Sequence, residues 1–326
     1  MSPPSPVFAV PADAPAAAAA IVAAVGPATD GPPATASRGA LGTSAILALA
    51  AVYLIWGSTY LVMRIAVETL PPMLMGAVRF TIAGSLLLAI GRYRSGRLPT
   101  WAEWRAAAPV GALLFVGGNG LVAFAETEVS SGIAAVVVAT MPLWMAVFAT
   151  ALGERPRARE WLGIAVGVSG VVILMSGAEL SARPVAALLL GLSPVAWALG
   201  STLGRRARLA PGLLGSATQQ LTGGLAMIAV GLVRGERWPA TMTFDGVWTL
   251  AYLIVFGSLI AFTAYAWLLR NTRPAVATSY AFVNPPLAVL LGAALGAEAI
   301  GTTTLIATPV VVAAVVLVVG RPRARS

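Results

Sequence analysis

Arg79 and Glu126 are charged side chains within the apolar runs of this sequence, and they are the residues best able to do chemistry in it. Arg79 lies six residues into the run 73–91, and Glu126 ends the run 105–126. In a lipid environment such a charge costs at least about 2.5 kcal/mol unless it is paired or hydrated. Two interpretations stay open. Arg79 forms an ion pair with Glu126, or it binds the carboxylate of a small molecule.

Aromatic and amide side chains recur near the middle of the same kind of run. Lipid-facing helix surface is normally aliphatic, so such side chains at mid-depth indicate a face turned toward protein or a cavity. Trp56 and Tyr60 share one helix face, and Tyr280 and Asn284 share another, because residues four apart are neighbours. The alternative is plain helix packing. With the two charges included, the predicted lining is Trp56, Thr59, Tyr60, Arg79, Asn119, Glu126, Trp197, Tyr265, Tyr280 and Asn284.

Several prolines lie inside the apolar runs. Each removes a backbone hydrogen bond and leaves a carbonyl one turn earlier without its partner. Such a carbonyl is tolerated in a membrane only beside protein or water. We therefore expect kinks or gating positions, which are compatible with a cavity, at Pro142, Pro194, Pro285 and Pro286.

The composition indicates an integral membrane protein. Of the 326 residues, 58% are apolar and only 10% are charged, whereas a soluble domain carries about 25% charged residues. The chain contains no Cys and no His, which excludes thiol catalysis, disulfides, Cys/His metal sites and imidazole acid–base chemistry. No paired carboxylates share one depth either. We therefore expect no enzyme activity, no cofactor and no metal.

Ten apolar runs separated by short links predict an all-α polytopic membrane protein. About 20 residues at 1.5 Å per residue cross the roughly 30 Å of a bilayer core. Residues 1–40 are rich in Pro and are expected to form a disordered tail; a start codon assigned too early is the alternative. The predicted spans are 44–66, 73–91, 105–126, 130–152, 160–177, 184–204, 212–233, 247–269, 275–296 and 300–320.

The arginines predict the orientation in the membrane. If the N-terminus is cytoplasmic, sixteen of the 21 basic residues fall in inner segments and three in outer loops. Such an asymmetry follows the positive-inside rule. Both termini are therefore expected in the cytoplasm, which agrees with an even number of spans. The net charge of +9 is explained by topology, and we expect no nucleic-acid partner.

An internal repeat divides the chain. Residues 142–154 read PLWMAVFATALGE and residues 286–298 read PLAVLLGAALGAE, so Pro and Glu recur at one offset. Five spans per half is an odd number, so the second copy must be inverted in the membrane, an architecture known from transporters. Glu154 and Glu298 are read as structural helix ends. The predicted divisions are a first repeat 41–178, a second repeat 179–320 and a basic cytoplasmic C-terminus 321–326.

Four strings carry a family resemblance: WGSTYLVMRIAVETLPPMLMGAVRF (56–80), GNGLVAFAE (118–126), SGIAAVVVATMPL (131–143) and ATSYAFVNPPLAVLLG (277–292). They resemble the drug/metabolite transporter superfamily and, more narrowly, EamA-type ten-helix exporters of the bacterial inner membrane, the YedA-like branch. Ala297 stands where the Gly-Glu pattern of the family expects Gly. The resemblance implies two inverted five-helix bundles around a central cavity, but it names no substrate.

The function expected from this resemblance is secondary transport by alternating access, exporting small metabolites, amino acids or drug-like amphipathic compounds. The partners would be a small-molecule substrate and the lipid bilayer, with the chain a monomer or homodimer. The alternative is a lipid or lipid-linked sugar flippase of similar architecture. Glu126 is the plausible acidic group within a span for proton coupling, so coupled and facilitated transport both stay open.

Overall fold

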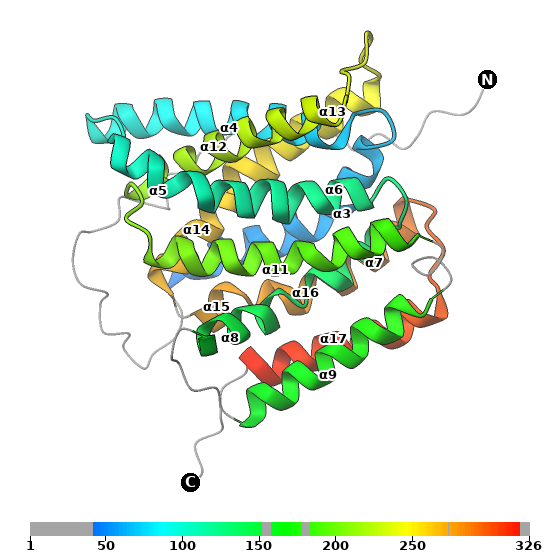
Figure 1. Ribbon diagram of the computed structural model, residues 1–326. Coiled ribbons are helices and arrows are strands. Elements are labelled where there is room, and N and C mark those ends of the chain that lie inside the picture. The colour runs from blue at the N-terminus through cyan, green and yellow to red at the C-terminus, as the bar shows by residue number, and fades with distance from the viewer. Residues whose placement is uncertain (1–41, 152–157, 178–182, 273, 320–326) are drawn as a thin grey trace.

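The structure is a helical bundle whose axes run mostly in one direction across the view of Figure 1. It is a computed structural model that describes residues 42–151, 158–177, 183–272 and 274–319. Within those ranges the regular structure is α-helix and π-helix, without strands. The predicted tail 1–40, the C-terminal segment 321–326 and Glu154 lie outside the described residues.

Each of the ten predicted apolar runs contains helix. In the first predicted half the elements are α2 (Thr43–Ala51), η1 (Val52–Trp56), α3 (Gly57–Ala66), α4 (Pro72–Ser95), α5 (Trp101–Gly111), η2 (Ala112–Gly120), α6 (Leu121–Ala125), α7 (Ser131–Val138), α8 (Met141–Ala151) and α9 (Ala158–Met175). In the second they are α11 (Pro184–Arg206), α12 (Gly212–Val233), α13 (Phe244–Tyr252), η3 (Leu253–Ala261), α14 (Phe262–Asn271), α15 (Pro274–Ala277), α16 (Tyr280–Leu295) and α17 (Thr302–Val319).

Many of these helices are suited to a bilayer by length and composition. Large apolar side chains such as Leu54, Val172 and Leu232 are more than half exposed, as expected for surface in contact with lipid. Among the described residues, six helices meet the length and hydropathy of a membrane span: Thr43–Ala66, Pro72–Ser95, Trp101–Ala125, Ser131–Phe148, Pro184–Arg206 and Phe244–Asn271. Shorter apolar helices cover Trp161–Leu174, Val283–Leu295 and Thr302–Leu317.

The predicted kink positions differ in their local structure. Pro142 lies in the first turn of α8, directly after the turn at Ala139 and Thr140 that separates α8 from α7. By contrast, α11 continues as helix through Pro194, and α16 continues through the Pro285–Pro286 pair. The helical structure is instead interrupted before this pair, at the turn that separates α15 from α16.

Three of the spans change from α-helix to π-helix part-way, which the sequence did not reveal. These segments are η1, η2 and η3, and each continues into an α-helix without a gap in the chain. A π-helix shifts the backbone hydrogen bonds from the fourth to the fifth residue, is rare, and is found frequently at functional sites. All three segments contribute to the cavity described below.

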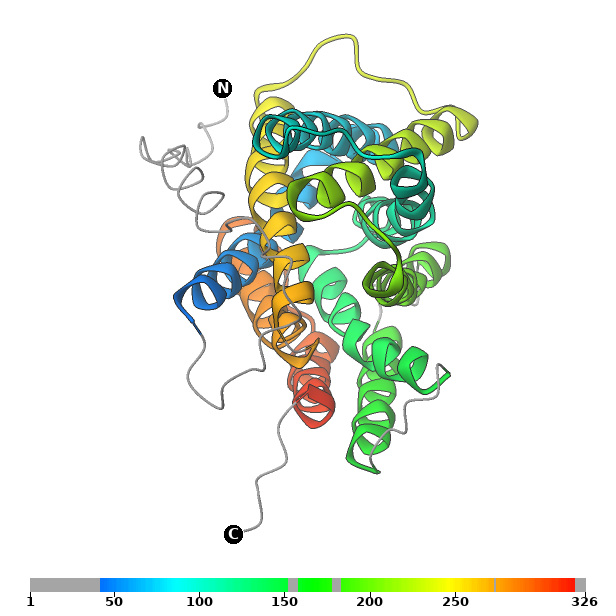
Figure 2. The same ribbon diagram turned by 90° about the vertical axis from the view of Figure 1, so that its left-hand side faces the viewer.

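Close helix contacts hold the bundle together. Helix α4 packs along α12, and Gly84 lets the two backbones approach, because a Cβ on it would lie 3.0 Å from the Leu221 amide nitrogen. Helices α9 and α17 lie side by side at the end of the molecule away from α4 and α12 (Figure 1 and Figure 2). Helix α16 packs against α7, so the two predicted halves are in direct contact there.

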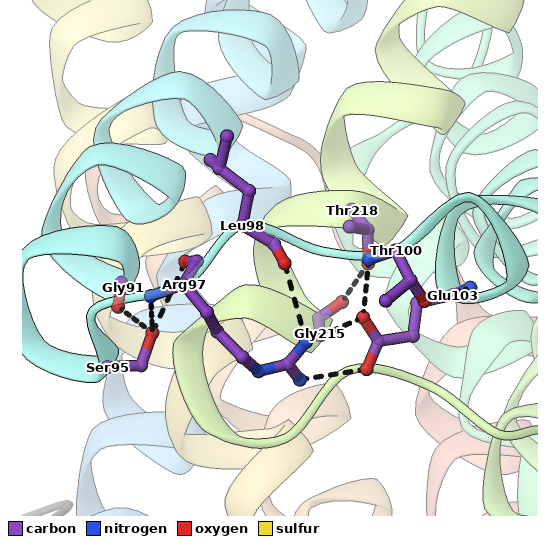
Figure 3. A network of polar contacts seen from close by, with 8 residues as sticks. All are labelled: Gly91, Ser95, Arg97, Leu98, Thr100, Glu103, Gly215 and Thr218. Carbon is purple, nitrogen blue, oxygen red and sulfur yellow. Dashed lines mark hydrogen bonds and ion pairs between the residues drawn. The ribbon is translucent and has the colours of Figure 1, made fainter.

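The loop between α4 and α5 is fixed by a small polar network, shown in Figure 3. Helix α4 ends at Gly96, whose φ of 69° is readily adopted by glycine. Thr100 and Glu103 form a capping box at the start of α5. Arg97 donates from Nη1 and Nη2 to the Glu103 carboxylate at 2.9 and 2.8 Å, and these hydrogen bonds raise the pKa of Arg97. These contacts stabilise the loop in the conformation seen here.

Candidate functional site

A cavity of about 60 Å³ lies where the three π-helical segments meet. Its walls come from both predicted halves of the chain. Seven of the ten residues predicted as its lining do line it: Trp56, Thr59, Tyr60, Arg79, Asn119, Trp197 and Tyr280. The further lining residues are Met63, Phe80, Phe115, Gly118, Val122, Val138, Ser193, Gly257 and Phe262.

Trp56 is the centre of an aromatic cluster at this cavity. Its ring centroid lies 5.6 Å from that of Trp197, 4.9 Å from that of Tyr265 and 5.2 Å from that of Tyr280. Two of the three contacts are edge-to-face, an arrangement in which the positive edge of one ring meets the negative face of another. Tyr265 lies behind this layer, where its hydroxyl is 3.0 Å from Ser201 Oγ.

Backbone carbonyls of the π-helical segments accept side-chain hydrogen bonds around the cavity. Trp56 donates from Nε1 to the Gly257 carbonyl at 3.3 Å, and Gln220 donates from Nε2 to the Ser258 carbonyl at 3.1 Å. The Ser193 hydroxyl donates to the Gly118 carbonyl at 3.0 Å. Buried carbonyls need such partners, so side chains from neighbouring helices stabilise the altered backbone.

Arg79 enters the cavity as a buried cation and is only 3% exposed. Its Nε donates to Ser258 Oγ at 2.7 Å, and its Nη1 lies 3.5 Å from Asn119 Oδ1. The guanidinium carbon also lies 4.7 Å from the centroid of the Phe80 ring, within the range of a cation–π contact. The Ser258 hydroxyl, the Asn119 amide and the Phe80 ring therefore surround the charge of Arg79. None of these groups carries a negative charge.

The predicted ion pair between Arg79 and Glu126 is wrong. Arg79 reaches toward η3, whereas Glu126 follows α6 and has Glu298 and Arg64 as its charged neighbours. Neither carboxyl oxygen of Glu126 has a hydrogen-bond partner in the described part of the chain. Similar depth along two helices does not place two side chains together, because the direction of each helix face also matters.

Three predicted lining residues lie outside the cavity. Glu126 is fully buried, Asn284 is 2% exposed, and Tyr265 is 1% exposed. The Asn284 side-chain amide has no hydrogen-bond partner among the described residues. The structure therefore brings most of the predicted lining residues together at the cavity, whereas these three are buried outside its lining.

Sequence reasoning missed part of the lining. Gly118 and Gly257 receive the Trp197 ring and the Arg79 guanidinium, and a Cβ on Gly257 would lie 2.7 Å from Arg79 Nη2. The signal available was a small residue within an apolar run. That signal is common to helix packing in membranes, so it does not single out a site.

A second cavity, of about 40 Å³, lies on the other side of the aromatic layer. Phe262 contributes to both cavities and so forms part of the wall between them. Arg205 and Arg270, both predicted to lie near the cytoplasm, contribute to the second cavity together with Tyr265. The two cavities therefore lie next to each other, with Phe262 in the lining of both.

Comparison with known proteins shows the family of the chain. The sequence profile of the EamA-like transporter family matches residues 43–176 and again residues 184–320. The chain belongs to this family. It contains two copies of the EamA unit, and the π-helical segments and the residues that line the cavity lie within them.

The chain is also similar to individual EamA-type proteins. It is 46% identical over 272 residues to the uncharacterized inner membrane transporter YedA of Escherichia coli (strain K12), covering 83% of this chain and 89% of that protein. It is 23% identical over 253 residues to the uncharacterized transporter YoaV of Bacillus subtilis (strain 168), with 76% and 87% covered. A solved crystal structure matches with a TM-score of 0.61 and 23% identity, over 85% of this chain and 96% of that one, which shows the fold alone.

Proposed function

We propose that this protein is a secondary transporter of the inner membrane that exports small molecules with an anionic group and an apolar or aromatic body. The observation that carries the proposal is Arg79, a buried cation without an acidic partner among the described residues, in the wall of an aromatic cavity. Metabolites, amino acids and drug-like amphipathic acids all fit this description. Membership of a transporter family supports the proposal.

The chemistry of Arg79 favours an anion. A guanidinium offers five N–H donors in a planar fork that matches a carboxylate. Within the described part of the chain, the hydrogen bonds of Arg79 run from Nε and Nη1, which leaves Nη2 for another acceptor. A bound carboxylate would neutralise the charge, and because the arginine is already buried, only the carboxylate would have to be desolvated on binding.

The aromatic residues would bind the rest of the substrate. Trp56, Trp197 and Tyr280 line the cavity with ring surface, and ring surface binds apolar groups of varied shape. The amide of Asn119 and the hydroxyl of Thr59 can orient polar substituents. Such a lining favours a class of compounds over a single one.

The size of the cavity indicates a contracted state. Ligand pockets usually measure about 300–1,000 Å³, whereas this one measures about 60 Å³. Binding would therefore require the halves to move apart. We propose alternating access between two inverted five-helix repeats, in a ten-span arrangement with both termini in the cytoplasm and with Phe262 and the Trp56 cluster closing the inner side. The transporter would work as a monomer or homodimer.

Export is tested by comparing the metabolites outside cells that contain or lack the protein, followed by transport in liposomes. We expect organic anions to accumulate outside only when the wild-type protein is present. Arg79→Gln should abolish the difference at equal protein level, and Arg183→Gln, which changes an exposed arginine, should preserve it. Accumulation of the same compounds with Arg79→Gln would refute the role of Arg79.

A further inference from the structure

Glu126 is a second buried charge site, distinct from the cavity that contains Arg79. Its side chain is 0% exposed, and neither carboxyl oxygen has a hydrogen-bond partner in the described part of the chain. A buried carboxylate without partners is far less stable than a buried neutral acid. Geometry and burial therefore favour a proton on this side chain in the conformation seen here.

The charged groups around Glu126 do not neutralise it. From α3 the neighbours are Tyr60 and Arg64, and from the segment after α16 the neighbour is Glu298. Arg64 lies 3.7 Å from Glu68 on the surface. Glu298 is engaged at the start of α7, where its carboxylate accepts from the Ser131 amide and hydroxyl at 3.0 and 2.8 Å. The charge of Glu298 further disfavours a second carboxylate nearby.

In the described part of the chain, the other packed elements bring no counter-ion either. Helices α4 and α11 contact α6. On α4 the charge is Arg79, whose hydrogen bonds go to Ser258 and Asn119. At the start of α11, Arg183 lies 3.8 Å from Glu128 at the surface. After α12, Arg234 lies over the Phe124 ring of α6 and is 3.8 Å from Glu236. Each of these charges thus has another partner.

Glu126 lies one helical turn beyond the wall of the cavity. Its amide donates to the carbonyl of Val122 at 2.9 Å, and Val122 lines the cavity. Tyr60 also lines the cavity and is an electrostatic neighbour of Glu126. Glu126 therefore follows one lining residue by a helical turn and has a second as an electrostatic neighbour, on the side predicted to face out of the cell.

We propose that Glu126 is the proton-binding site of this transporter, and that proton binding there permits the outer half to close. The proposal rests on the transport function proposed above. When the outer half opens, water reaches Glu126, and its carboxylate can then bind a proton from water or release it again. Closure buries the side chain and retains the proton. Substrate and proton then bind at separate sites, at Arg79 and at Glu126.

Infrared spectroscopy of the protein in liposomes tests proton binding without any substrate. At pH 7 ordinary acidic side chains are ionised, since their usual pKa values are about 4. We expect the wild type to show a carboxylic-acid C=O band at pH 7 that shifts in D₂O. Glu126→Gln should lack the band, while Glu128→Gln, which removes a surface acid two residues away, should retain it. A band that persists in Glu126→Gln, or no band in the wild type, overturns the proposal.

Thermal stability gives a second readout and a check on folding. Gln has the size and neutrality of protonated Glu, so Glu126→Gln should unfold at or above the wild-type temperature. The folded wild type binds one more proton than the unfolded chain, so its stability should fall as the pH rises. In Glu126→Gln this fall should become smaller, and in Glu128→Gln it should match the wild type. Equal pH dependence in the wild type and Glu126→Gln contradicts a buried neutral acid.

Coupling is tested with benzenesulfonate, an aromatic anion that stays ionised across the pH range used. In liposomes with a clamped membrane potential, one proton exchanged per anion allows about tenfold accumulation per pH unit. We expect the gradient to drive accumulation with the wild type, and only equilibration with Glu126→Gln. Accumulation by Glu126→Gln overturns coupling through Glu126. If the wild type does not move benzenesulfonate, the transport proposal is weakened, whereas the infrared band still decides proton binding.

Discussion

Trp56 of η1 donates a hydrogen bond from its indole nitrogen to the backbone carbonyl of Gly257 in η3, 3.3 Å away. This contact joins two spans that are 201 residues apart in the chain, one in each copy of the EamA unit. The carbonyl belongs to a π-helical segment, and the same indole ring contacts three other aromatic rings. The Trp56 side chain thus connects the backbone of η3 with the aromatic cluster, and the first half of the chain with the second.

Replacing Trp56 should separate its two roles. Trp56→Phe keeps a ring but removes the bond to Gly257, and a neutral hydrogen bond contributes about 1 kcal/mol. Trp56→Ala also removes the ring contacts, and such truncations cost about 3–5 kcal/mol in a core. Thermal unfolding should follow that order, and transport should fall in both. Trp161→Ala, at a half-exposed tryptophan, should change neither. Full activity of Trp56→Ala would exclude a central role.

Gly257→Ala should disturb Arg79 directly. The added Cβ would lie 2.7 Å from Arg79 Nη2, so the end of the guanidinium must shift, while its Nε bonds Ser258 in the wild type. We expect a loss of transport of about tenfold, equivalent to about 1.4 kcal/mol in binding, because the shifted guanidinium would no longer be positioned for the anion. The measurement is the initial rate in liposomes. Gly191→Ala, where a Cβ meets nothing within 4 Å, is the control. Equal transport rates for Gly257→Ala and Gly191→Ala would show that the space at Gly257 does not matter for Arg79.

Glu298→Gln should weaken the start of α7. The carboxylate accepts hydrogen bonds from the amide and hydroxyl of Ser131 and lies 3.4 Å from the amide of Gly132. Loss of a charged cap typically costs about 0.5–2 kcal/mol, so the unfolding temperature should fall by a few degrees. Glu128→Gln serves as the matched surface control. An unchanged unfolding temperature for Glu298→Gln would show that this cap contributes nothing measurable.

Reporter fusions test the predicted topology. A reporter placed after Arg97 should lie in the cytoplasm, and one placed after Val129 should lie outside, because the arginine-rich loops are predicted to face inward. An alkaline phosphatase reporter is active only outside the cytoplasm and should report the second position alone. Activity at both positions, or at neither, would contradict the proposed orientation and the inverted arrangement derived from it.

The helical runs could be predicted because the apolar patterning of a membrane protein fixes them. Lipid requires every backbone group to bond within its own segment, so a long apolar run must be helical. The cavity lining was partly predictable for a related reason. Trp56, Tyr60 and Tyr280 gain nothing from facing lipid, and all three line the cavity.

The π-helical segments and the partners of the buried charges were not predictable in this way. The π-helical carbonyl of Gly257 accepts a hydrogen bond from the indole of Trp56, which comes from a distant part of the chain. The choice between Ser258 and Glu126 as the partner of Arg79 depends on the rotation of each helix about its axis, which residue counting does not give. Tertiary packing decides both.

The most direct test of the account is to identify what the purified protein binds. Wild type, Arg79→Gln and Arg183→Gln would each be incubated with an extract of small metabolites, and the retained compounds would be released and identified by mass spectrometry. The account predicts that wild type and Arg183→Gln retain the same aromatic or apolar acids, and that Arg79→Gln loses them. Retention of neutral or cationic compounds by the wild type, or of the same acids by Arg79→Gln, would contradict it.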